Sequence, residues 1–218
     1  NPFRHFATDM PSDSATVSRD IIRWIETKLF ATTTPPNEVA AIVIEAVQGE
    51  GGYVPAPTEF IRDIRRICDE HGILMIVDEV QAGMGRTGKM FALQHHEGVK
   101  ADIICTAKGI GSGLPIAACV ARAEIMNWHK GAHASPFGGN PVCIASALKT
   151  IELLEGGLVK NAEVVGAHLK KGLERLKEKY GEIGDVRGMG MMLGVEFVTD
   201  SKSLRPAPEL RDRVEMEC

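Results

Sequence analysis

The sequence predicts an α/β fold built on a mainly parallel sheet flanked by helices. Short apolar runs at 39–44, 73–77, 103–106 and 116–120 have the length and composition of buried strands. Segments between and after them show helical periodicity, and this alternation is typical of βαβ units, whose strands lie parallel in one sheet. Each apolar run is far shorter than the roughly 20 residues of a membrane helix, so we expect no interaction with a membrane.

Glycine and proline set the limits of the elements in the first half of the chain. The run 39–44 follows a Thr-Pro-Pro segment, carries no charge, and is expected to form a strand buried on both faces, with Gly49 to Gly52 breaking the chain after it. A helix is expected from Pro57 to His71-Gly72, with one apolar face made of Phe60, Ile61, Ile64, Ile67 and Cys68.

The next strand, 73–77, ends on Asp78 and Glu79. Strand 103–106 precedes Lys108, and a loop with three glycines leads to strand 116–120. A helix over 142–154 is stopped by Gly156-Gly157, and a longer helix over 159–180 has an apolar stripe made of Leu169, Leu173 and Leu176. That second helix could link two domains.

Beyond residue 182 the pattern changes to short strands of antiparallel character, at 183–186 and 191–197, and then to a helical segment at 209–218. We therefore predict that 1–182 belong to a large domain with its linking helix, and that 183–218 begin a smaller α+β domain. The chain starts at Asn1-Pro2-Phe3 without a signal-peptide pattern and stops within a helical pattern, so a fragment of a longer protein is expected.

Composition excludes several function classes. The net charge of −4 and the pI of about 6.0, with scattered lysines and arginines, give no basic surface for nucleic acid. The five cysteines are odd in number and include no Cys-x-x-Cys spacing. This usage favours a reducing, cytoplasmic location.

Two residues at predicted strand ends indicate a cofactor. Asp78 and Lys108 both follow buried strands, and ligands of parallel sheets bind at that edge. A carboxylate there needs a partner, and the protonated ring nitrogen of pyridoxal 5'-phosphate (PLP) is one. Lys108 lies among small residues and could act as the nucleophile that attaches PLP. Alone, an Asp-Glu pair is more often a cap and a lysine more often a surface residue; their combination favours PLP.

The motifs of the chain closely resemble class III, ω-type aminotransferases of the 4-aminobutyrate and acetylornithine aminotransferase kind. They are Glu45-Ala-Val-Gln-Gly-Glu50-Gly-Gly, Val77-Asp-Glu-Val-Gln81, Gly85-Arg-Thr-Gly-Lys89, Lys108 and Phe137-Gly-Gly-Asn-Pro141, with Arg187-Gly-Met-Gly190 similar to the start of the family's small domain. The resemblance covers nearly the whole chain. It implies PLP fold type I, a homodimer, and transfer of an amino group from an ω-amine or amino acid donor to a 2-oxo acid.

The resemblance also implies roles for individual residues. Lys108 would bind PLP, Asp78 would pair with the pyridinium nitrogen, Val80 would pack on the ring, and Gln81 would bond the ring's phenolic oxygen. Glu50 matches a glutamate that, in many relatives, pairs with a switchable arginine, and Glu45 matches a neighbouring site glutamate.

The sequence departs from the family pattern at the phosphate. Pro136 stands where a threonine commonly reaches the PLP phosphate of the neighbouring subunit, and proline offers neither a hydroxyl nor an N–H. Ser135 could take over that contact. The family's Ser-Gly phosphate loop, its ring-stacking aromatic residue and its carboxylate-binding arginine have no counterpart in these 218 residues, and Arg187 belongs to a different motif.

Four alternatives remain beside transamination. Racemases, epimerases and aminomutases on the same scaffold share Lys108 and Asp78, and a truncated segment without catalysis is a further possibility. The run Gly83–Lys89 has the glycine and lysine spacing of a P-loop, but Met90 stands where a serine or threonine must hold Mg²⁺. A metal site at His95, His96 and Glu97 is disfavoured because these residues lie in a polar stretch, and no metal is expected.

Overall fold

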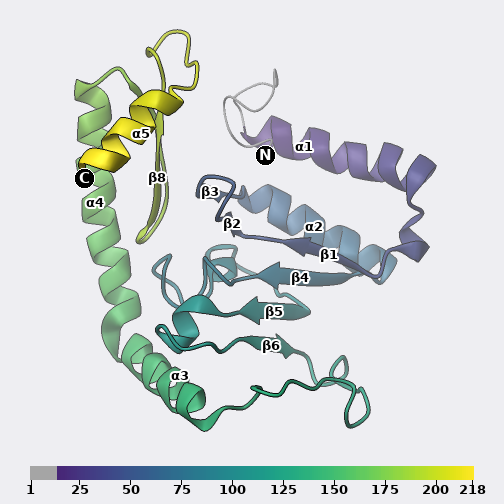
Figure 1. Ribbon diagram of the computed structural model, residues 1–218. Helices are drawn as coiled ribbons and strands as arrows, with labels where there is room; N and C mark the ends of the chain where they lie inside the picture. The colour runs from purple at the N-terminus through teal and green to yellow at the C-terminus, as the bar shows by residue number, and fades with distance from the viewer. Residues whose placement is uncertain (1–13) are drawn as a thin grey trace.

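The computed structural model describes residues 14–218, and its centre is a four-stranded sheet (Figure 1). The strands lie in the order β1-β4-β5-β6. Their bounds are β1 Ala41–Ile44, β4 Leu74–Asp78, β5 Ile103–Thr106 and β6 Ala118–Ala121. Residues 1–13, which the sequence assigned to the large domain, lie outside the described part of the chain.

The pairing of the strands confirms the mainly parallel sheet, with one exception. β1 pairs with β4 and β4 with β5 in parallel, whereas β6 runs antiparallel to β5. The reason is the connection at 107–117, which holds only a single-turn 3-10 helix, Lys108–Gly111. A parallel return needs a crossover of a dozen or more residues, so this short connection can only reverse the direction of the chain.

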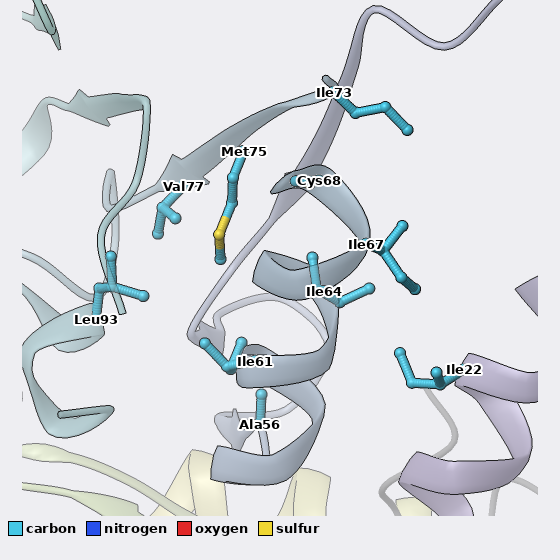
Figure 2. Packing of buried hydrophobic residues seen from close by; sticks show 10 residues of the cluster. All are labelled: Ile22, Ala56, Ile61, Ile64, Ile67, Cys68, Ile73, Met75, Val77 and Leu93. Atoms are coloured by element: carbon cyan, nitrogen blue, oxygen red, sulfur yellow. The ribbon is translucent and has the colours of Figure 1, made fainter. Parts of the chain in front are cut away.

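The core lies between helix α2 (Thr58–His71) and the sheet (Figure 2). Three isoleucines of α2 are fully or almost fully buried, and they belong to one core cluster with Met75 and Val77 of β4: Ile61, Ile64 and Ile67. Their spacing of three residues places them on one face of the helix, as the sequence predicted. Gly72, with φ of 68°, ends the helix in the left-handed conformation that glycine adopts without strain.

The opposite face of the sheet is much less covered. The side chain of Val43 in β1 is 64% exposed, so the prediction that the strand at 39–44 is buried on both faces was wrong. β1 is the edge strand of the sheet. Within residues 14–218, its core contacts lie on the face of the sheet that α2 covers. Alternation therefore decides exposure along β1, because successive side chains point to opposite faces.

Two elements near the start of the described chain were not expected from the sequence. Helix α1 (Ser14–Trp24) packs on α2 and contributes Ile22 to the core, and a π-helical segment, Ile25–Thr33, follows it. A short 3-10 helix, Pro36–Glu38, leads into β1. The expected break at Gly49–Gly52 is the turn of a small antiparallel hairpin, β2 (Val47–Gln48) and β3 (Val54–Pro55).

The two predicted helices of the second half form one bent arm beside the sheet (Figure 1). α3 (Pro141–Leu153) begins at Asn140, whose Oδ1 accepts bonds from Val142 N and Cys143 N. A π-helical segment, Leu154–Leu158, bends the chain at Gly157, where φ is 137°, and α4 (Val159–Lys179) continues. No helix within residues 14–218 combines the length and apolarity that crossing a bilayer requires.

The apolar stripe predicted on α4 is not a buried face. Leu169 and Leu176 are 42% and 44% exposed. Within residues 14–218, α4 instead makes its closest approach at Gly166, where a Cβ atom would lie 2.1 Å from the carbonyl oxygen of Gly190. Helical periodicity identified the helix correctly, but not the side of it that meets the rest of the chain.

A second sheet lies along α4 (Figure 1). It is the antiparallel hairpin β7 (Ile183–Met189) and β8 (Met192–Phe197), followed by helix α5 (Pro208–Glu217), in agreement with the predicted change of pattern. The tip of the hairpin contacts the large sheet's loops, since Met191 N donates to Arg86 O at 2.9 Å. The domain boundary near residue 182 stays a prediction.

The buried carboxylate of Asp102 connects helix α2 to β4 and to the residue that follows β6. Asp102 Oδ2 accepts from Met75 N of β4 and from Arg65 Nη1 of α2, both at 2.7 Å, and Oδ1 contacts Arg122 Nη2 at 2.9 Å. Burial alone would raise the pKa of Asp102, but the bond from Met75 N and the two guanidinium groups outweigh it and lower that pKa. The ionised form is therefore the one that holds α2, β4 and β6 together.

We expect Asp102→Asn to lower the free energy of unfolding by about 3 kcal/mol, because it leaves Arg65 without its buried partner. Asp69→Asn is the matched control: it removes the exposed carboxylate on the same arginine and should cost at most about 1 kcal/mol. Urea denaturation of the two variants and the parent chain measures the difference. Equal losses in the two variants would contradict the assigned role.

The depressed pKa of Asp102 gives this stabilisation a definite pH dependence. The contribution is complete above the pKa of the unfolded chain, near 3.9, and is lost as pH falls through the lower pKa of the folded state. The stability gap between the parent chain and Asp102→Asn should therefore close in acid. A gap that stays constant from neutral pH to about pH 2 would contradict an ionised Asp102.

A second pair of variants tests the contact between α4 and the hairpin tip. Gly166→Ala should destabilise the chain by about 1–3 kcal/mol, because its methyl group has no space against Gly190. Gly172→Ala, on the same helix, meets nothing within 4 Å and should stabilise the chain by up to about 1 kcal/mol. Thermal unfolding of the two variants checks both signs, and destabilisation by both would contradict the explanation.

Candidate functional site

The two residues that indicated a cofactor lie at the same edge of the sheet. Asp78 is the last residue of β4, and Lys108 follows the end of β5 by two positions. Since β4 and β5 are parallel neighbours, their carboxyl ends meet at one edge, with Asp78 in register with Cys105. Lys108 has φ of 43°, in the left-handed region that a non-glycine residue rarely occupies. Such strained backbone persists where the surroundings impose it, and it is common at functional sites.

Lys108 opens into a cleft of about 250 Å³ that Val80 and Gln81 also line. Three of the predicted cofactor residues therefore share one cavity, and the Lys108 side chain is exposed there. The other lining residues had no role predicted from the sequence, although Arg86 lies within the motif Gly85-Arg-Thr-Gly-Lys89. They are Tyr53, Gly83, Met84, Arg86, Gly109, Met191 and Met192.

Asp78 and Glu79 have different surroundings despite being adjacent. Asp78 is half-buried, and its Oδ1 accepts from Val80 N at 2.9 Å. Within residues 14–218, its Oδ2 has no hydrogen-bond partner. Glu79 is fully buried and accepts from Ala92 N and Leu93 N at 2.9 and 2.8 Å. Glu79 thus caps backbone N–H groups, which is the common role of an acidic residue after a strand. Asp78 keeps one carboxylate oxygen available for a ligand.

The buried Glu79 carboxylate fixes the turn that carries Val80 and Gln81. Its side chain holds the start of the 3-10 helix Ala92–His95, and its carbonyl oxygen accepts from Gly83 N at 2.9 Å. Burial raises the pKa of Glu79, and the bonds from Leu93 N and Ala92 N partly offset that rise. The turn is therefore anchored on a group that the cleft itself does not contact.

Gln81 connects the cleft to the predicted substrate residues. Its Nε2 donates to Glu50 Oε1 at 2.6 Å, and a Cβ atom at Gly49 would lie 2.6 Å from Gln81 Cδ. Gly49 thus leaves the space that the Gln81 amide occupies. Glu45 is further back, and its Oε2 accepts from Gly49 N at 2.7 Å. Glu50 therefore lies beside the cleft, whereas Glu45 braces the turn that carries it.

Ser135 is the predicted site residue that does not join this group. It is exposed in the connection between β6 and α3, and it does not line the cleft of Lys108. The contact that the structure gives it is local, from Gly138 N to its carbonyl oxygen at 3.1 Å. Its role at the phosphate stays a prediction.

The geometry disfavours a P-loop and a site at the adjacent histidines. Residues 80–91 form a series of turns and bends that ends in a single-turn 3-10 helix, so no long helix starts at Lys89 as a P-loop requires. His95 Nε2 bonds Thr87 O at 3.1 Å, while His96 Nδ1 bonds Thr58 Oγ1 at 3.1 Å. Burial lowers the pKa of both rings. In the described part of the chain, no three metal-ligating side chains converge.

Arg187 makes structural contacts within the chain. Its Nε donates to Gly52 O at 2.8 Å, and its Nη1 pairs with Glu196 at 2.6 Å and Asp185 at 3.0 Å. Two carboxylates thus neutralise a largely buried guanidinium that docks the β7–β8 hairpin on the turn after β2. It offers little charge to a substrate.

The residues around the cleft fit PLP. Lys108 supplies an amine in the cavity, and Asp78 supplies a carboxylate oxygen without a partner at the adjacent strand end. Gly109 allows the close approach of Met84 in the cleft wall, since a Cβ atom at Gly109 would lie 3.1 Å from Met84 Cβ. A flat aromatic ring needs this combination of a nucleophile, a counter-charge and open space.

Comparison with known proteins agrees with this chemistry. The family model described as aminotransferase class-III matches residues 5–213. The leucine/methionine racemase of Thermococcus litoralis is 47% identical over 186 residues, which are 84% of this chain and 42% of the racemase. The diaminobutyrate–2-oxoglutarate aminotransferase of Rhizobium meliloti is 47% identical over 163 residues, 74% of this chain and 34% of that enzyme.

Solved structures give the same result. A PLP-bound amine transaminase from an uncultivated Pseudomonas species superimposes with a TM-score of 0.82 at 34% identity, over 90% of this chain and 46% of that one. The chain thus spans less than half the length of these relatives. The match confirms PLP fold type I and PLP as the cofactor of this fold. The chain belongs to the class-III aminotransferase family.

Proposed function

We propose that the protein catalyses PLP-dependent transamination, moving an amino group from an ω-amine or amino acid to a 2-oxo acid. The observation that supports it is the convergence of Lys108, Val80 and Gln81 on one cleft, with Asp78 at the neighbouring strand end. Membership of the class-III family agrees with this reaction. The proposed enzyme is a cytoplasmic homodimer, as the resemblance to ω-type aminotransferases and the cysteine usage suggest.

Each residue has a distinct role in this proposal. PLP, when bound, supplies an electron sink for bond breaking at the substrate's Cα atom. The Lys108 amine attaches the cofactor and then carries the proton that leaves and returns at Cα. The Asp78 carboxylate keeps the ring nitrogen protonated, Val80 packs on the ring, and the Gln81 amide orients the ring's phenolic oxygen.

Substrate contacts are assigned to the glutamates and the phosphate contact to Ser135. Glu50 lies within hydrogen-bond distance of Gln81, so its charge is held next to the cofactor. Its carboxylate would meet a positively charged group of the donor or of the protein. Glu45 acts through the turn at Gly49, and Ser135 would reach the phosphate of the neighbouring subunit. Residues 183–218 would begin the small domain that closes the site.

Racemisation is the second candidate function, because a relative with 47% identity is described as a leucine/methionine racemase. Both reactions use Lys108 and Asp78, so the products must distinguish them. We would incubate the PLP-loaded chain with a single L-amino acid, with and without a 2-oxo acid. A new amino acid formed from the 2-oxo acid supports transamination, whereas loss of optical activity without it supports racemisation. The absence of both products would support the non-catalytic alternative.

Lys108→Ala should abolish covalent attachment of PLP and lower turnover by roughly 10²- to 10⁴-fold, the range of positioned proton transfer. Borohydride reduction followed by tryptic mapping provides a readout independent of activity. A modified Lys108 resists trypsin and yields one peptide covering residues 101–122. Lys100→Ala, an exposed lysine outside the cleft, is the control and should change neither turnover nor the labelling of Lys108. Its labelled peptide covers residues 90–122, because trypsin no longer cleaves after residue 100. Label on a different lysine would refute the assignment.

Asp78→Asn should lower turnover by roughly 10²-fold, because a neutral amide does not favour the protonated ring nitrogen. Covalent labelling of Lys108 should persist, so the effect separates from loss of cofactor. Asp63→Asn, which removes a partly exposed carboxylate on α2, serves as the control. Unchanged turnover in Asp78→Asn would rule out the proposed charge pairing.

A further inference from the structure

Two of the five cysteines face each other across antiparallel strands. Cys105 of β5 and Cys119 of β6 are direct register partners. The side chains of such partners lie on the same face of the sheet with Cβ atoms about 4.5–5.5 Å apart. Their Cα separation, about 4.5 or 5.5 Å, falls within the range of disulfides, roughly 4.4–6.8 Å. Both thiols are free, and the pKa of the Cys105 thiol is raised, first by burial and then by the neighbouring Cys119.

The pair continues a row that begins at the cofactor site. Asp78 is the register partner of Cys105 on the other side of β5, so Asp78, Cys105 and Cys119 follow one another across three strands on one face. The backbone couples them as well, since Glu79 N donates to Cys105 O at 2.8 Å. Lys108 lies three residues beyond Cys105. A covalent change at the cysteines would therefore occur beside both residues that indicated PLP.

Exposure distinguishes the two thiols. Cys119 is exposed, while Cys105 is half-buried and burial raises the pKa of its thiol. The exposed Cys119 thiol is accessible to a reagent in solution. Once Cys119 has formed a mixed disulfide, its sulfur is the electrophile nearest to the half-buried Cys105 thiol. Cys68 and Cys143 are buried and Cys218 lies at the far end of α5. Only this pair, among the described residues, is in strand register.

We propose that Cys105 and Cys119 form a redox-active dithiol that a low-molecular-weight disulfide converts into a cross-strand disulfide. The Cys119 thiolate attacks one sulfur of the oxidant, whose S–S bond breaks and releases one thiol. The Cys105 thiolate then attacks the Cys119 sulfur, forming the Cys105–Cys119 bond and releasing the second thiol. The two cysteines are oxidised, the oxidant is reduced by two electrons, and the two cysteine protons end on the released thiols.

Intramolecular disulfides of this kind are transient and redox-sensing in reducing compartments. The bond would tie β6 to β5 next to Asp78, so the redox state of the pair would be transmitted to the cofactor site through the row of partners. This consequence depends on the proposed function, but the disulfide does not. The experiment is therefore carried out without PLP.

The test exposes the reduced 218-residue chain to glutathione disulfide at neutral pH. We expect the number of titratable thiols to fall from five to three and the intact mass to fall by two hydrogen atoms. Trypsin should release the peptides 101–108 and 109–122 joined by a bond that a thiol reductant cleaves. Glutathione attached to Cys119 alone, with Cys105 still free, would overturn the proposal, as would cross-links between other cysteines.

Variants assign the steps. Cys105→Ser should trap Cys119 as a stable mixed disulfide with glutathione, whereas Cys119→Ser should abolish both the mixed and the cross-strand disulfide. Because Cys119 is exposed, its replacement should leave the fold intact even if Cys105→Ser does not fold. Cys218→Ser, another exposed cysteine, is the matched control and should still form the joined peptides. Joined peptides that depend on Cys218 would refute the pairing.

Discussion

The parallel pairing of β4 with β5 organises the large sheet and its ligand-binding edge. It places the carboxyl ends of two strands side by side, and thereby brings Asp78 and Lys108 to one edge. Hydrogen bonds alone would leave the relative position of the strands weakly specified. Burial of Met75 and Val77 against α2 fixes which face of β4 points inward, because a shift of one residue would expose both side chains.

Asp102 adds a directional element to that apolar core. A hydrophobic contact stabilises α2 on the sheet without fixing its position along the strands. The carboxylate fixes it, since its partners are a backbone N–H of β4, a guanidinium of α2 and a second one after β6. Its desolvation is offset by these bonds, and each partner occupies a defined lone-pair direction. The apolar core and the interactions of Asp102 together stabilise the edge of the sheet at which the cleft forms.

The buried and the more exposed acidic residues of the site have different roles. Glu79 is buried and used entirely by the backbone, so it shapes the turn without contacting the cleft. Asp78 keeps one carboxylate oxygen available for a ligand, because only its Oδ1 accepts a hydrogen bond within residues 14–218. Glu50 lies beside the cleft and accepts a hydrogen bond from Gln81 Nε2. Chain segments far apart in sequence meet here, since the hairpin tip at Met191 closes one wall. Arg187 holds that hairpin on the turn after β2, which explains a largely buried guanidinium at this position.

Most of the elements, and the residues that indicate a cofactor, can be identified from the sequence alone. Apolar runs and punctuation located the four strands of the main sheet, α2, α3, α4 and the terminal hairpin, because periodicity and backbone preferences are local properties. Asp78 and Lys108 were identifiable since strand ends and small neighbours are visible in the chain. Helix α1 was missed although a local signal was present: Val17 and Ile21 are four residues apart, and Val17 and Ile22 lie on its buried face.

The covered faces and the residues that meet follow from packing between elements. The exposure of Val43 and of the leucines on α4, and the approach of Tyr53, Arg86 and Met191 to Lys108, depend on partners distant in sequence. The register that sets Cys105 opposite Cys119 belongs with them. A pattern along the chain fixes which side of an element is apolar, but packing free energy between elements decides what that side touches.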